Sequence, residues 1–262
     1  MMKNKYLVLA GNNKIEKGEN ILFLFPLKGF CVGMTREYSI EEIPDGAYVY
    51  LNRIFDTFGI EEFEHILPML EEKAKAIVFE DLGVLEVLQE KKSSLKTILY
   101  ATHALCSLSS VKAYLNVVDT VILSADLTLE EVDSIANETC VGSFAFGLLP
   151  VMYSRRKLIS NYAKHFGVSV KNPFLIEEPI HHRKFLLVEN DYGTVLYDYT
   201  VYNGYELLAC PCSFYLLDFE HIVVDDFSLW IEEFEAGKNQ DKSTGFLHQE
   251  TIYLLPPKED KK

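Results

Sequence analysis

The sequence predicts an α/β fold, a TIM-type (β/α)8 barrel that is irregular in its first units. Three observations lead to this prediction. Short, nearly continuous apolar segments recur along the 262 residues, as in parallel strands that are buried on both faces. Most of these segments precede a stretch with helical periodicity. Eight such strands in a chain of this length favour a closed barrel over an open, doubly wound sheet.

The expected strands are apolar runs that end at a glycine, a proline or a polar residue. The first seven span residues 6–10, 21–25, 47–51, 76–79, 97–101, 120–123 and 140–146. A glycine-bounded piece at 29–33 is not counted. The eighth strand is expected at 221–226, directly before a helix around 229–235.

Helices are expected where apolar residues recur every three or four positions. They span residues 60–72, 85–90, 110–115 and 128–135. Thr128 and Glu131 form a capping-box pattern at the start of the last of these helices. A further amphipathic helix is expected after the seventh strand and a short Leu-Leu-Pro link, with Ser154 as its N-cap.

Three cations, Arg155, Arg156 and Lys157, would lie in the first turn of that further helix. The helix dipole places partial positive charge at this end and favours anions there. Misplaced cations cost roughly a few tenths of a kcal/mol each when they are solvated, so a solvated helix start is one interpretation. The other is a site prepared for an anionic group.

Between the seventh and eighth strands the pattern changes to that of a β-hairpin. Residues 185–188 and 195–199 flank a turn that carries a glycine. We expect a small antiparallel insertion at about 176–212 that packs on the barrel mouth, within a single barrel domain of residues 1–237. Residues 238–262 are polar and are expected to form a C-terminal tail.

Composition excludes several classes of protein. The formal net charge of −14 argues against non-specific nucleic-acid binding, although a local basic patch remains compatible with an RNA substrate. No apolar run reaches the roughly 18 residues that a membrane helix needs, so no membrane partner is expected. The apolar run at the N-terminus is too short for a signal peptide, and we expect a cytoplasmic protein.

Five cysteines in a cytoplasmic chain are expected to be reduced thiols. Cys31, Cys106 and Cys140 lie in apolar surroundings and are expected to be buried packing residues. Cys210 and Cys212 are the only close pair. No second pair or histidine lies near them in the sequence, so no metal site is predicted.

Polar residues at strand ends are the candidates for chemistry, because barrel active sites lie where strands pass into the following loops. The catalytic candidates are His103 as a general base, together with Glu80 and Asp81. Each has a structural alternative: a carboxylate can cap a helix or pair with an arginine, and the histidine can shape its loop. The substrate-binding candidates are Arg53, Tyr153, Ser154, Arg155 and Arg156.

Four blocks resemble the collagenase-like peptidase family U32. They are IVFEDLG at 77–83, ATH at 101–103, LSADLTLEE at 123–131 and GLLPVMYSRRKLISNY at 147–162. Zinc-protease, P-loop, serine-hydrolase and dinucleotide-binding motifs are absent from the sequence. The resemblance implies a TIM-like barrel and oxygen-insertion chemistry, namely hydroxylation of transfer or ribosomal RNA bases or of ubiquinone. It also implies, for many members, an iron–sulfur cluster held by four cysteines.

The chain departs from the family pattern at the cluster ligands. Lys157 stands where the family usually has a cysteine, and residues 163–175 contain none. Phe146 replaces a histidine, and Ala125 replaces an arginine. Since a cluster needs its thiolates, no cofactor is predicted.

Three functions follow from this resemblance. The leading one is a cytoplasmic barrel protein that contributes to tRNA or rRNA base hydroxylation without its own cluster, with Arg155 and Arg156 holding an anionic group. The second is a non-catalytic partner subunit of a cluster-bearing paralogue. The third is a collagenase-like peptidase.

Overall fold

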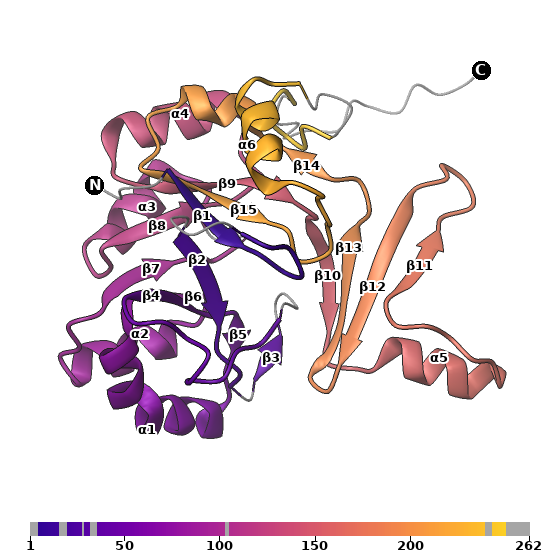
Figure 1. Ribbon diagram of the computed structural model, residues 1–262, viewed down its shortest axis with the longest axis horizontal. Coiled ribbons are helices and arrows are strands. Elements are labelled where there is room, and N and C mark those ends of the chain that lie inside the picture. Colours follow the sequence, from indigo (N-terminus) through magenta and orange to yellow (C-terminus); the bar gives the residue numbers. More distant parts are fainter. Residues whose placement is uncertain are drawn as a thin grey trace, which may run out of the picture.

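The computed structural model describes residues 5–15, 20–27, 29–31, 36–102, 105–238 and 243–249. Eight parallel strands close into a barrel (Figure 1). In chain order they are β1 (Tyr6–Leu9), β2 (Asn20–Leu24), β4 (Ala47–Leu51), β6 (Ala74–Phe79), β7 (Lys96–Leu99), β8 (Thr120–Leu123), β9 (Gly142–Gly147) and β15 (Phe214–Asp218). The neighbour order is β9-β15-β1-β2-β4-β6-β7-β8, and pairing of β8 with β9 closes the ring. The predicted barrel is confirmed.

Helices on the outside of the barrel begin at side-chain caps. They are α1 (Thr57–Lys73), α2 (Leu82–Glu90), α3 (Leu108–Leu115), α4 (Leu129–Glu138) and α6 (Phe227–Glu235). A short 3-10 helix η1 (Tyr205–Ala209) starts without a side-chain cap bond. Asp56, Asp81, Ser107 and Asp226 each accept a hydrogen bond from a first-turn N–H group. Thr128 caps α4, and the predicted capping box is confirmed. These bonds satisfy donors that a helix start otherwise leaves unpaired.

The eighth barrel strand lies earlier than predicted. It is β15, and it pairs with β1 and β9, whereas residues 221–226 form the loop that leads to α6. The side chains of Phe214 and Leu217 are almost fully buried, but Val223 is 78% exposed. Ile222 and Val224 pack against the core only in part, and residues 221–226 pair with no strand among the described residues, so this apolar run does not form a strand.

An antiparallel sheet projects from the barrel between β9 and β15 (Figure 1). Its elements are β10 (Pro150–Ser154), α5 (Leu158–Phe166), β11 (Phe174–Glu177), β12 (Lys184–Asn190) and β13 (Gly193–Asp198), and the sheet order is β10-β13-β12-β11. We call residues 150–198 the arm. The predicted hairpin is confirmed as β12 and β13, and it belongs to a larger sheet that starts at Pro150.

Two further short pairings lie next to the barrel strands. Strand β14 (Tyr202–Asn203) runs antiparallel to β9, and β3 (Phe30–Cys31) pairs with β5 (Arg53–Ile54). On the barrel side of the arm, Leu186, Val195 and Tyr197 form a small apolar cluster with Leu148. Of the predicted tail, residues 243–249 lie against the barrel, since Leu247 is buried and its carbonyl accepts from Leu129 N at 3.0 Å.

The helix predicted at Ser154 begins later, at Leu158. Arg155 and Arg156 lie in a turn before it, and Lys157 occupies the N-cap position without a side-chain cap bond. The Glu189 carboxylate on β12 instead accepts from Ile159 N at 2.8 Å and from the backbone and hydroxyl of Ser160. The predicted anion site at this helix start is therefore filled by the protein's own carboxylate.

Candidate functional site

Glu80 is a buried carboxyl group at the carboxyl end of β6, where barrel active sites lie. It accepts a hydrogen bond from the Tyr50 hydroxyl on β4. Burial raises the pKa of Glu80 to about 8, and the bond from Tyr50 only partly opposes this effect. At neutral pH Glu80 therefore carries a proton.

Asp218 ends β15 on the same side of the barrel. Burial raises its pKa to about 6, against a hydrogen bond of 2.8 Å from Glu220 N. Tyr50 and Tyr100 lie with their ring centroids 6.4 Å apart. Burial raises the pKa of both hydroxyls well above the usual range, and the charges of Glu80 and Asp218 raise it further. Four titratable groups, at or near the carboxyl ends of four strands, thus converge on one site.

The two carboxyl groups of the site, Glu80 and Asp218, differ in their protonation state at neutral pH. At neutral pH Glu80 can donate a proton, and Asp218 can accept one, because their surroundings hold their pKa values apart. Of these groups the sequence identified only Glu80. Tyr50 and Tyr100 carried no strand-end signal that separates them from core aromatics, and Asp218 ends a strand that the sequence placed elsewhere.

Asp81 has a structural position next to this site. Its carboxylate caps α2 through Gly83 N at 2.7 Å and accepts from Phe55 N at 2.6 Å. Both oxygens are thereby committed to backbone groups. The capping alternative describes this residue, and its catalytic role remains a prediction. His103, the predicted general base, lies outside the described residues.

Arg53 is almost fully buried, and its guanidinium joins three parts of the fold. It forms an ion pair with Glu37, donates to Leu27 O at 2.5 Å and lies 4.1 Å from the ring centroid of Tyr192 at the tip of the arm. A buried charge needs such partners. The structure thus places Arg53 as a link between the barrel and the arm.

Arg155 and Arg156 are exposed at the base of α5. Their turn is held by Arg156 N, which donates to Ser154 Oγ at 3.1 Å, and by Thr194 Oγ1, which donates to Arg156 O at 2.9 Å. Gly193 makes the close approach feasible, because a Cβ there would lie 2.1 Å from Ser154 O. Tyr153 is 55% exposed on β10.

Glu189 gives a direct test of how the α5 end of the arm is held. Glu189→Ala removes the acceptor of two first-turn N–H groups, so we expect α5 to lose about 1–2 kcal/mol of local stability. Amide hydrogen exchange across 158–166 should accelerate, while the barrel strands keep their protection. Glu86→Ala, which removes an exposed carboxylate from α2, is the control. Unchanged exchange in α5 would refute this account of the cap.

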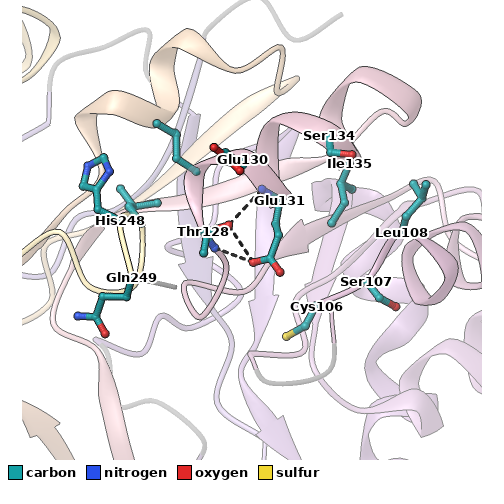
Figure 2. A pocket seen from close by; sticks show the side chains of 12 residues that line it. Cys106, Ser107, Leu108, Thr128, Glu130, Glu131, Ser134, Ile135, His248 and Gln249 are labelled. Carbon is teal, nitrogen blue, oxygen red and sulfur yellow. Dashed lines mark hydrogen bonds between the residues drawn. The ribbon is translucent and has the colours of Figure 1, made fainter. Parts of the chain in front are cut away.

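A cavity of about 990 Å³ opens between α3, α4 and residues 247–249 (Figure 2). Two of the titratable side chains that line it already have hydrogen-bond partners within the protein. Glu131 accepts from Thr128 N at 2.9 Å within the capping box, and His248 Nε2 lies 3.0 Å from Glu206. Partial burial raises the pKa of the Cys106 thiol, which keeps it protonated at neutral pH. A second cavity, of about 680 Å³, lies at the opposite, N-terminal end of the barrel around Lys75 and Lys96.

The donor groups at the family's cluster position do not fit a four-thiolate cluster. Lys157 forms an ion pair with Asp191 at 2.6 Å, and Phe146 packs against Trp230 with ring centroids 4.4 Å apart. The described residues contain no group of three or more His, Cys, Asp or Glu side chains that could hold a metal ion. Contrary to prediction, Cys106 and Cys140 are exposed.

The fold and the polar strand ends define a closed (β/α)8 barrel with a titratable site at its C-terminal mouth. The model of peptidase family U32 matches residues 38–168, half of the chain, and the protein belongs to this family. No curated protein sequence matches it. A solved structure described as the U32 peptidase Mk0906 superposes with a TM-score of 0.49 at 12% identity, covering 83% of this chain and 92% of that one. Within the described residues, every helix is too short or too polar to cross a bilayer.

Proposed function

We propose that this member of family U32 is a cytoplasmic component of RNA base hydroxylation, acting on transfer or ribosomal RNA without an iron–sulfur cluster of its own. The observation that carries the proposal is the exposed Arg155-Arg156 pair at the base of α5, next to the hairpin tip that contacts Arg53. Arginine presents a planar donor fork that suits phosphate.

The local contacts support an anion-binding role for these two side chains in particular. The Glu189 carboxylate already fills the start of α5, and Lys157 is paired with Asp191. The helix start and Lys157 therefore offer no site to an incoming phosphate. The turn that carries the arginines is fixed through Ser154 and Thr194. A fixed turn lowers the conformational cost of binding.

The mouth supplies complementary chemistry for a base. A protonated Glu80 and an ionised Asp218 offer a hydrogen-bond donor and an acceptor, as the edges of an unstacked nucleobase require. Because the thiolate ligands are replaced, we propose that a cluster-bearing paralogue supplies the redox step as the partner of this chain.

The test is the hydroxylated-nucleoside content of cellular RNA in a strain that carries Arg155→Ala/Arg156→Ala. We expect a loss of about tenfold, which corresponds to roughly 1.4 kcal/mol of lost phosphate binding. Lys75→Ala/Lys96→Ala removes the same charge at the opposite end of the barrel and should leave the content unchanged. Unchanged content in the arginine variant would reject the proposal.

A non-catalytic partner subunit is the second candidate, and the replacement of the family cysteine by Lys157 favours it. Glu80→Gln distinguishes the two candidates in the same assay. Hydroxylation should fall in this variant only if the barrel mouth is catalytic, because only then does the reaction depend on the proton of Glu80. The peptidase reading has no such support. Among the described residues no serine or cysteine is paired with a histidine base, and burial lowers the pKa of His221 to about 4.

A further inference from the structure

The outer face of the arm sheet, turned away from the barrel, carries a row of apolar side chains. Strand register places Met152, Leu196, Leu187 and Phe174 in one row across the four strands. Leu186, Val195 and Tyr197 alternate with them on the barrel side, where they are buried. The outer row therefore has to be covered by something other than the barrel.

Helix α5 covers this row only in part. It lies on the outer face, because Glu189 and Thr194 on that face bond its first turn. Ile159 is its single buried residue, whereas Tyr162 and Phe166 are 48% and 60% exposed. The centroids of these two rings lie 4.7 Å apart. An exposed apolar patch of this kind, made of Tyr162, Phe166 and the outer row, marks an interaction surface.

The arm is basic, while the rest of the chain is strongly acidic. Of the chain's 25 Lys and Arg and 39 Asp and Glu, the arm holds seven and five, so the remainder holds 18 and 34. All five arm carboxylates contact groups within the arm, as Asp198 does with Arg183 at 2.6 Å. Lys164 and Lys171 are exposed beside the patch, without an ion-pair partner among the described residues. Whatever covers the patch is expected to be apolar and acidic.

The same chain carries a surface of that character on the barrel rim. Phe58 and Leu82, in the first turns of α1 and α2, are 76% and 50% exposed. The bond from Phe55 N to Asp81 at 2.6 Å holds these two helix starts together. Glu61 and Glu62 follow in α1. In Figure 1 the rim helices α1 and α2 and the arm's outer elements lie on opposite sides of the molecule, so an arm does not reach its own rim.

We propose that a second copy of this chain covers the outer face of the arm, each arm docking on the α1–α2 rim of the other copy. Two equivalent arm-to-rim contacts give a closed two-fold dimer. A direct arm-to-arm contact is disfavoured, because it would bring two basic surfaces together. The inference is independent of the RNA proposal.

Sedimentation equilibrium of the full chain tests the dimer and its geometry. Wild type should be dimeric, and both the arm variant Tyr162→Ser/Phe166→Ser and the rim variant Phe58→Ser/Leu82→Ser should be monomeric. An equimolar mixture of the two variants retains one intact contact and should form a dimer at least about 100-fold weaker than wild type. The control, Val223→Ser, changes an exposed residue elsewhere and should stay dimeric. Urea midpoints verify that every variant is folded.

The other outcomes overturn the proposal. A wild type that stays monomeric up to its solubility limit excludes the dimer. A rim variant that remains dimeric while the arm variant is monomeric indicates arm-to-arm contact. A dimer that tightens with added salt indicates the same, because salt screens the attraction between oppositely charged surfaces and should weaken an arm-to-rim contact. If wild type is monomeric and binds a single-stranded uridine oligonucleotide, and the arm variant does not bind it, the patch is an RNA-binding surface instead.

Discussion

Replacing Phe146 with alanine is expected to lower the free energy of unfolding by about 3–5 kcal/mol. The side chain is 0% exposed, at the end of β9. Its ring packs against those of Trp230, Phe219 and Phe234, with centroids at 4.4, 5.0 and 6.2 Å. Removing it leaves a cavity in the cluster that fastens α6 to the barrel, because neither the sheet nor the helix can close the gap without moving.

Urea denaturation measures this loss directly. Val223→Ala, at a loop position that is 78% exposed, is the control and should change stability by less than about 0.5 kcal/mol. An equal, small loss for both variants would contradict the packing account. The result also bears on the family pattern, since the position where a histidine is expected serves here as part of the apolar core.

The barrel was predictable because its strands are buried on both faces, and such strands show as continuous apolar runs. Seven of the eight were located this way. The eighth was misplaced because residues 221–226 contain a run of β-branched residues. Whether a side chain such as Val223 is covered in the fold cannot be read from the sequence. The strand at Pro150 was missed for a related reason: an edge strand with exposed Val151 and Tyr153 lacks the alternation that marks a half-buried strand.

The site was predictable only where chemistry coincides with a strand end. Glu80 met that condition, but its partner Tyr50 lies inside β4 and resembles any core aromatic in the sequence. The cap of α5 is a long-range contact, because Glu189 lies 30 residues after Ile159. Local patterns predict caps from within a few residues, so Ser154 was assigned a role that β12 supplies instead.

The largest effect of pH on stability is expected from Glu80. Its pKa is about 8 in the fold against an ordinary value of 4.5, so the folded chain holds a proton that the unfolded chain releases above pH 4.5. The stability that this proton contributes is complete below pH 4.5 and is lost as pH rises to about 8. The full loss is on the order of 5 kcal/mol.

Glu80→Gln isolates this contribution, because glutamine still accepts from the Tyr50 hydroxyl but does not ionise. We expect the variant to match wild type near pH 5 and to exceed it increasingly as pH rises, by up to about 1.4 kcal/mol per pH unit. Urea midpoints between pH 7 and 9 measure the difference, above the pKa of about 6 at which Asp218 titrates. In the control Glu64→Gln, the ion pair with Lys91 lowers the pKa of the exposed carboxyl, so the difference from wild type should change only at acidic pH and stay constant between pH 7 and 9. A difference for Glu80→Gln that stays constant with pH would mean that Glu80 is already ionised in the fold, and would remove the proton donor from the barrel mouth.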